Sequence, residues 1–174
     1  MITIRDYCES DSGSVGRLIA ETYRTYNLGF AAPDEQADLL GPFQFADSPE
    51  PAHQAAIAEV IAAPMVLVAE DAGTIVGVLR GGRVDHKQRT VLQSLFVDGR
   101  YHRQGIGRQL VTRFEQECWE RGVTIIKLAS TLYAVPFYLA SGYKRTTGLR
   151  TLHSFSGSGS AYQPMKKVLE TKRA

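Results

Sequence analysis

The chain has 174 residues, a length that corresponds to a single domain with a sizeable core. Hydrophobic residues make up 44% and charged residues 22%, as is ordinary for a globular protein. No apolar run of about 18 residues is present, so we expect no membrane span, and the first residues carry no signal pattern. The two cysteines, Cys8 and Cys118, are too few for a disulfide scaffold and favour a cytoplasmic location.

The formal net charge of +2 hides a segregation of charge along the chain. Residues 25–79 hold eight acidic residues and no Lys or Arg, whereas residues 80–174 hold 17 basic and six acidic residues. This asymmetry has two interpretations: two partners of opposite sign, one cationic and one anionic, or two solvated faces that differ. Charge alone does not choose between them.

Alternation and helical periodicity predict the elements of the first half. Residues 2–5 alternate as a strand, and Asp11 or Ser12 would cap a helix that extends to Tyr26. A short helix is expected over residues 33–40. Ser48-Pro49 would open a further helix, which Pro64 would end.

The second half is richer in strand patterns. We predict a hairpin of residues 65–70 and 74–81 around Asp71-Ala72-Gly73, a strand over 89–97 and a helix over 105–121. The remaining elements are a strand over 124–130, a short helix over 134–141, a strand or its lead-in over 143–146, and closing strands over 149–155 and 161–169 joined by a flexible Ser/Gly connection. This order indicates an α/β or α+β domain around a mixed sheet.

A basic loop with two glycines connects the strand at 89–97 to the next helix. It reads His102-Arg103-Gln104-Gly105-Ile106-Gly107-Arg108. The first N–H groups of a helix have no intrahelical acceptor, and the helix dipole places partial positive charge there. Because Arg103 and Arg108 add formal charge at the same place, the loop is predicted to bind a phosphate or pyrophosphate.

Three ligand classes use such a loop. A Walker loop needs Gly-Lys-Ser/Thr, which is absent. A dinucleotide-binding loop needs a third glycine where Leu110 stands, and an acidic residue about 20 positions on, where Lys127 stands. The third class is an acyl-CoA.

Two motifs of the chain resemble those of the GCN5-related N-acetyltransferase (GNAT) family. The pyrophosphate motif Arg/Gln-x-x-Gly-x-Gly/Ala corresponds to residues 102–107, with His102 at the first place. The motif Asn-x-x-Ala-x-x-Phe-Tyr-x-x-x-Gly-Phe/Tyr corresponds to residues 131–143, with Thr131 in place of Asn. The resemblance implies one GNAT domain over residues 1–174, with about seven strands and about four helices.

The resemblance also implies an activity and a set of site residues. Acetyl-CoA would be the co-substrate, no metal would take part, and a primary amine of a small molecule or peptide would attack the thioester directly. Tyr138 would be the general acid that protonates the leaving thiolate. The cofactor-binding residues would be Leu95, Phe96, Val97, Arg103, Gln104, Gly105, Ile106, Gly107, Arg108, Thr131 and Phe137.

Several alternatives stay open. Tyr138 has a core role as its alternative, and the general base is not identified among Asp85, His86, Glu21, His53 or a water chain. A non-catalytic acyl-CoA sensor would have the same loop. A nucleic-acid-binding domain would use Arg100, Arg103, Arg108 and Arg113, but it lacks a recognised motif, and we expect neither a nucleic-acid nor a membrane partner.

Other residues have structural or positional interpretations. Cys118 and Trp119 are expected to be packed, and His102 to be a solvated loop residue. Dimers are common in the family, so the resemblance names a homodimer as a candidate assembly of this chain. Asp34, Glu35 and Asp38 lie in the segment that would border an acceptor site, where negative charge would attract a cationic amine.

Overall fold

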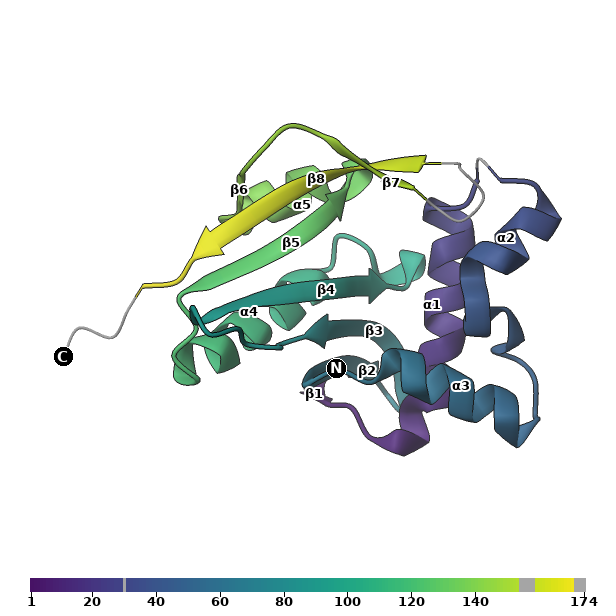
Figure 1. Ribbon diagram of the computed structural model, residues 1–174. Coiled ribbons are helices and arrows are strands. Elements are labelled where there is room, and N and C mark those ends of the chain that lie inside the picture. Colours follow the sequence, from purple (N-terminus) through teal and green to yellow (C-terminus); the bar gives the residue numbers. More distant parts are fainter. Residues whose placement is uncertain (30, 154–158, 171–174) are drawn as a thin grey trace. The chain divides into compact units, whose positions relative to one another are not determined.

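The structure, a computed structural model, describes residues 1–29, 31–153 and 159–170 (Figure 1). The described part has eight strands in a mixed sheet and five α-helices, as the chain-order reading of the sequence predicted; the family resemblance implied about seven and about four. The strands are β1 (Ile2–Asp6), β2 (Met65–Asp71), β3 (Thr74–Gly81), β4 (Arg89–Val97), β5 (Ile125–Thr131), β6 (Lys144–Arg145), β7 (Arg150–His153) and β8 (Gly159–Val168). The helices are α1 (Ser12–Tyr26), α2 (Pro33–Leu40), α3 (Pro51–Ile61), α4 (Ile106–Glu120) and α5 (Val135–Ala140).

The chain divides into two compact units, which are described in turn. The first consists of Met1–Gly81 and Ser94–Phe114, and the second of Gly82–Gln93 and Glu115–Ala174. The strand order is β1-β2-β3-β4-β5-β8-β6, with β7 paired to β8, and β4 contributes residues to both units. No helix among the described residues is both long and apolar enough to cross a membrane.

The first unit contains the predicted hairpin. Strands β2 and β3 pair antiparallel from Met65 opposite Gly81 to Asp71 opposite Thr74, so Asp71 belongs to the strand and not to the turn. The two turn residues, Ala72 and Gly73, have φ angles of 48° and 84°. Positive φ at both positions is the geometry of the tight hairpin turn, whose twist matches that of the strands. Strand β1 pairs antiparallel with the other side of β2.

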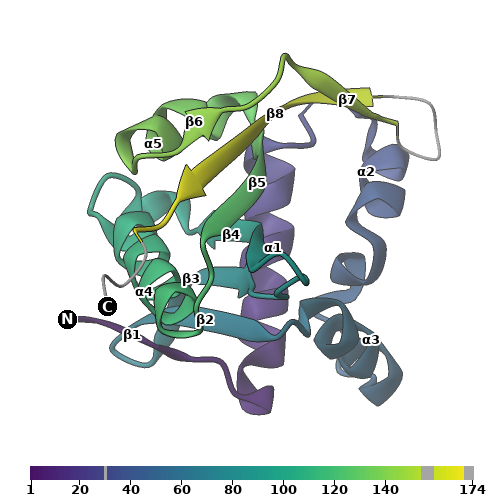
Figure 2. The ribbon, with the colours of Figure 1, turned by 60° about the vertical axis from the view of Figure 1, so that its left-hand side comes forward.

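Helices α1 and α3 pack together on one face of this sheet (Figure 2). Their contact is close because a β-carbon at Gly16 would lie 2.9 Å from Cγ2 of Ile57. Val68 and Val78 supply the sheet side of the same core. The first turns of α4 lie on the opposite face, where a β-carbon at Gly77 would meet Leu110 and Ile106.

Two helix starts differ from the prediction. Helix α3 begins at Pro51, because Glu50 precedes a proline and adopts an extended conformation (φ −67°, ψ 127°) that cannot continue a helix. The Ser48 hydroxyl instead accepts a bond from the Glu50 N–H and contacts Nδ1 of His53. Asp11 occupies the N-cap position of α1, but its carboxylate is bound by Arg5 and does not cap the helix.

The second unit is centred on two neighbouring strands, β5 and β8, which lie side by side in both views (Figures 1 and 2). They pair antiparallel from Ile125 opposite Val168 to Thr131 opposite Tyr162, and β5 also pairs parallel with residues 89–91 of β4. Strands β6 and β7 both pair with β8. The strand expected over 143–146 is only the two residues of β6.

The predicted closing strands also have different limits. The strand expected over 149–155 is β7, whose described residues end at 153, and β8 begins at Gly159, two residues earlier than predicted. Residues 156–158 of the expected Ser/Gly connection lie outside the described residues. Trp119, expected to be packed, is 37% exposed, because its Nε1 donates a 2.7 Å hydrogen bond to the Glu170 carbonyl at the surface.

Candidate functional site

The loop between β4 and α4 has the conformation of an anion-binding turn. Arg103 and Gly105 both have left-handed φ angles, 62° and 80°. The first intrahelical bond of α4 runs from the Gln109 N–H to the Gly105 carbonyl, so the N–H groups of residues 106–108 have no acceptor within the helix. A short left-handed segment followed by free amides at a helix start makes a concave site for a phosphate.

The side chains of this loop fall into two groups. Arg103, Gln104 and Arg108 are exposed, and neither arginine has an ion-pair partner among the described residues. Ile106 is 1% exposed, since its side chain packs in the core next to Gly77. Of the loop residues predicted to bind a cofactor, Ile106 can therefore contribute only its backbone N–H.

Asp98 fixes the start of the loop. Its N–H donates to the Val76 carbonyl on β3, and its carboxylate accepts from the Arg100 N–H at 2.9 Å and pairs with Nη2 of Arg100 at 2.6 Å. Arg100 holds the pKa of this carboxyl below its usual range. The charge of Arg100 is thus balanced within the loop, in contrast to the charges of Arg103 and Arg108.

His102 holds the middle of the loop. It is half-buried and not solvated as the sequence suggested: Nε2 lies 2.9 Å from the Val97 carbonyl, and the ring lies 5.1 Å from that of Tyr26 on α1. Tyr101 donates a hydrogen bond to Asp71 at the end of β2. These contacts attach the loop to α1 and to the end of β2.

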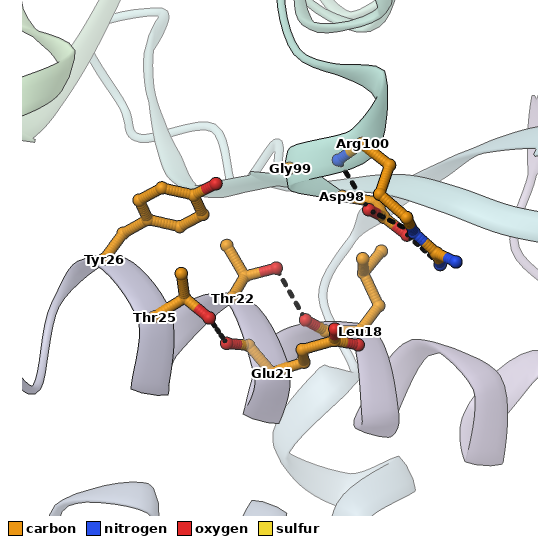
Figure 3. A pocket seen from close by; sticks show the side chains of 8 residues that line it. All are labelled: Leu18, Glu21, Thr22, Thr25, Tyr26, Asp98, Gly99 and Arg100. Carbon is orange, nitrogen blue, oxygen red and sulfur yellow. Dashed lines mark hydrogen bonds and ion pairs between the residues drawn. The ribbon is translucent and has the colours of Figure 1, made fainter.

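A pocket of about 230 Å³ lies between α1 and residues 98–100 (Figure 3). The hydroxyls of Thr22 and Thr25 donate to carbonyls of their own helix, those of Leu18 and Glu21. The polar groups that remain in the pocket are the Glu21 carboxylate, the Tyr26 hydroxyl and the Asp98–Arg100 pair. Glu21 is therefore the one base candidate of the sequence analysis that lines this pocket.

The strand that leads into the loop is half-buried over Leu95, Phe96 and Val97. Phe96 packs against the core of the first unit, with its ring 5.6 Å from that of Tyr23. These three residues and the loop from Arg103 to Arg108 therefore form one continuous stretch of the first unit.

Three predicted site residues belong to the second unit. Tyr138 on α5 is 6% exposed, and its ring makes edge contacts with Phe137 at 5.0 Å and with Tyr143 at 5.6 Å. Burial raises the pKa of Tyr138, so its phenol stays protonated well above neutral pH. Thr131, at the end of β5, is exposed and Phe137 is half-buried.

Two of the other base candidates have structural partners. Asp85 accepts hydrogen bonds from the backbone of Lys87 and Arg89 and from the Arg89 side chain, which hold its pKa low and fix the turn before β4. His53 stacks on Phe45 at 4.1 Å and bonds Ser48. His86 is exposed. The described residues include no group of three or more side chains that could hold a metal ion.

Cys118 is confirmed as a packed residue. It is fully buried, and burial raises the pKa of its thiol to about 12. A thiol of this kind is not a nucleophile at neutral pH. Tyr26, a tyrosine that the sequence allowed either at an acceptor pocket or in a core or rim role, lines the pocket of Figure 3 and meets Gly99, a contact between two segments that are far apart along the chain.

Comparison with known proteins gives matches at the level of fold and of domain family. Residues 40–169 match the acetyltransferase (GNAT) domain family. The PaiA N-acetyltransferase of Thermoplasma acidophilum, solved in complex with coenzyme A, is 14% identical, with a TM-score of 0.69 over 97% of this chain and 99% of its own. The ribosomal-protein-S18-alanine N-acetyltransferase of Escherichia coli is 18% identical, with a TM-score of 0.65 over 100% and 99%.

A GCN5-related N-acetyltransferase of Rhodopseudomonas palustris is 20% identical, with a TM-score of 0.70 over 96% of this chain and 95% of its own. Comparison with curated proteins gave no match. Identities this low establish the fold, whereas the domain match spans most of the chain and includes the loop at 102–108 and the segment at 131–143. The chain therefore belongs to the GNAT family of acetyltransferases.

Proposed function

We propose that this protein transfers an acetyl group from acetyl-CoA to a primary amine of a small molecule or peptide. The observation that carries the proposal is the start of α4, where free N–H groups at 106–108 lie beside the unpaired Arg103 and Arg108. Four anion-binding elements meet there: backbone donors, a helix dipole and two guanidinium groups. This set would match the several negative charges of a pyrophosphate and a nearby phosphate better than the single charge of a carboxylate.

The other predicted cofactor residues have roles that their exposure allows. Gln104, Gly105 and Gly107 would let the phosphates approach the backbone, and Ile106 would offer its N–H alone. Leu95, Phe96 and Val97 would bind the extended pantetheine arm through backbone groups. Thr131 and Phe137 would contribute at the end of β5 and the start of α5.

The reaction needs a neutral amine, because an ammonium has no lone pair. The amine nitrogen attacks the thioester carbon, the carbon–sulfur bond breaks, and the departing thiolate takes a proton. We propose that the Tyr138 phenol gives that proton, since burial keeps the phenol protonated. Holding both substrates in one site would supply much of the rate through proximity.

Charge favours a cationic acceptor. Asp34, Glu35 and Asp38 lie on α2, in the stretch of the chain that has no Lys or Arg. Their field would favour a cationic amine over a neutral one. A cytoplasmic location and a homodimer remain predictions, which cell fractionation and light scattering test.

Two measurements test the proposal together. Calorimetric titration with acetyl-CoA should give saturable binding with a dissociation constant in the micromolar range, and absence of binding there would contradict the assignment. A panel of primary amines assayed with thiol detection should then release CoA with at least one of them. Binding without thiol release by any amine would identify the non-catalytic acyl-CoA sensor instead.

A further inference from the structure

Arg80 lies near the end of β3 on the face of the sheet that α1 and α3 cover. Val78, two residues before Arg80, belongs to the core on that face. Because side chains alternate along a strand, Arg80 and Val78 point to the same side of the sheet. The contacts agree: one guanidinium nitrogen, Nη1, donates to the Val60 carbonyl at the end of α3. Arg80 is also close enough to Tyr23 on α1 for the two groups to interact electrostatically.

The rest of this guanidinium has no hydrogen-bond partner in the part of the chain that the structure describes. Nε is buried and makes no hydrogen bond among the described residues, and Arg80 forms no ion pair with any of them. Burial lowers the pKa of Arg80, but an arginine side chain stays charged in proteins. With Nη1 used by Val60, the edge formed by Nε and Nη2 is the one that is left.

A second buried polar atom lies on the neighbouring strand. The bond from the Asp98 N–H to the Val76 carbonyl sets the antiparallel register, in which Arg80 lies opposite Ser94 or within one residue of it. Ser94 precedes Phe96 by two residues and therefore shares the face on which Phe96 meets Tyr23. The Ser94 hydroxyl is buried and has no hydrogen-bond partner among the described residues.

A role for Arg80 as a cap of α3 explains only part of this arrangement. A cation at the last carbonyls of a helix is favourable, which accounts for the bond to Val60. It does not account for the free Nε edge or for Ser94. Buried polar groups without partners are rare in native proteins because each one loses the hydrogen bonds it made to water, so two of them on neighbouring strands and one face indicate a missing ligand.

The charge of the cluster and its position near the surface indicate the chemical class of the ligand. Arg80 is the first Lys or Arg after Arg24, and the eight acidic residues between them leave it unpaired. A single guanidinium in a stretch of the chain that is otherwise acidic balances one negative charge, which favours a carboxylate over a doubly charged phosphate. Arg80, Ser94, Phe96 and Tyr23 are each half-buried, so the cluster lies near the surface of the first unit.

We infer that Arg80 and Ser94 bind a carboxylate of the acceptor, so that the acceptor is an amine that also carries a carboxylate, such as an amino acid. The Nε and Nη2 edge of Arg80 would donate to both carboxylate oxygens, and Ser94 would donate a third hydrogen bond. The acidic residues of α2 and the cation on β3 would then recognise the two ends of a zwitterion. The inference rests on the proposed function, of which it names the substrate class.

The first test compares amino acids with their carboxamides as acceptors, for example L-phenylalanine with L-phenylalaninamide and L-glutamate with L-glutamine amide. In Arg80→Gln, kcat/KM should fall at least 10-fold for the carboxylates and less than 3-fold for the carboxamides. Arg83→Gln, which removes an exposed arginine three residues on, is the matched control and should change neither. An equal loss on both acceptor types would reduce Arg80 to a structural cap and overturn the inference.

The second test separates this inference from the proposed function. N-acetyl-L-phenylalanine and its carboxamide, the products of transfer, are titrated into the protein without acetyl-CoA. The wild type should bind the carboxylate at least 10-fold more tightly than the carboxamide even if no amine is acetylated. Ser94→Ala leaves the bond from Arg80 to Val60 intact and should reduce the preference about 3-fold; equal affinity of the wild type for both probes would refute a carboxylate site.

Discussion

The Tyr26 hydroxyl on α1 lies so close to Gly99 that a β-carbon at position 99 would stand 2.3 Å from it. Real β-carbons essentially never come this close to another atom, so a side chain at position 99 would force the Tyr26 ring or the loop after β4 to shift. The Tyr26 ring also lies beside His102, three residues farther along the same loop. One side chain of α1 thus contacts both ends of the segment that leads to the proposed phosphate site.

Gly99→Ala tests this contact. We expect the free energy of unfolding to fall by about 1–3 kcal/mol, as for an overpacked site, and the dissociation constant of CoA to rise because the loop must move. Urea denaturation and calorimetric titration measure the two effects.

Tyr26→Phe provides the internal control for Gly99→Ala. Without the hydroxyl, the nearest ring atom would be 3.4 Å from the new methyl group, a tolerable contact. The alanine should therefore be nearly neutral in the Tyr26→Phe background. Equal effects of Gly99→Ala in both backgrounds would show that the hydroxyl does not set the constraint.

Charge reversal at the two unpaired arginines of the loop tests the phosphate site. Arg103→Glu and Arg108→Glu should each weaken CoA binding about 10-fold or more at low salt, since each replaces attraction of the phosphates by repulsion. The difference from wild type should shrink as ionic strength rises, because these side chains are exposed and salt screens them.

Arg24→Glu on α1 is the matched control, an exposed arginine outside the loop with the same change of charge. It should alter CoA affinity by less than about 2-fold. If all three reversals weaken binding equally, the effect is one of net charge and the loop is not the phosphate site.

Tyr138→Phe tests the proposed acid. We expect kcat to fall about 100-fold and the KM for acetyl-CoA to stay within about 2-fold, because the phenol would act on the leaving thiolate and not on binding. Burial raises the pKa of Tyr138, so the wild-type phenol stays protonated through pH 10, and its ionisation should produce no loss of kcat below that pH.

Tyr143→Phe is the control for a buried phenol, since its ring packs 5.6 Å from that of Tyr138 and it is 1% exposed. It should leave kcat within about 2-fold of wild type. A full kcat in Tyr138→Phe would assign Tyr138 to the core, the alternative reading of its helix position.

Local sequence signals predicted the elements that depend on local chemistry. The run from 89 to 97 gave the bounds of β4, and Asp71-Ala72-Gly73 gave the hairpin, because a tight turn needs residues that accept positive φ. The paired glycines after the basic loop located the start of α4 to within one residue. The family resemblance identified the fold, which composition and periodicity had narrowed only to a mixed α/β sheet.

Features that depend on distant partners were not predictable in this way. Asp11 had the residue type and position of a helix cap, but an arginine six residues earlier binds its carboxylate. His102 read as a solvated loop residue because the Tyr26 ring that covers it comes from another helix. The strand pattern did not predict the burial of the Arg80 Nε, because this burial depends on the packing of α1 and α3 against the sheet.

The ion pair of Arg5 and Asp11 should give stability a measurable pH dependence. The two η nitrogens of Arg5 bind the two Asp11 oxygens at 2.7 and 2.9 Å, and the Cys8 N–H adds a third bond. Together, with the Arg5 side chain as the largest cause, they lower the pKa of Asp11 from its usual range to about 2. A carboxyl whose pKa is lower in the folded state stabilises the fold above its unfolded pKa, and this contribution is lost as pH falls toward the folded pKa.

Asp11→Asn should therefore reduce the free energy of unfolding at pH 7 by about 1–2 kcal/mol, since solvent screens part of the attraction of the partly exposed Arg5. The gap between wild type and variant should be full at pH 5 and narrow by about half at pH 3. Urea denaturation at the three pH values measures it, with Asp6→Asn, an exposed aspartate of β1, as the control that should leave stability within about 0.5 kcal/mol. A gap that stays constant from pH 7 to pH 3 would mean that Asp11 stabilises the fold by its shape and not by its charge.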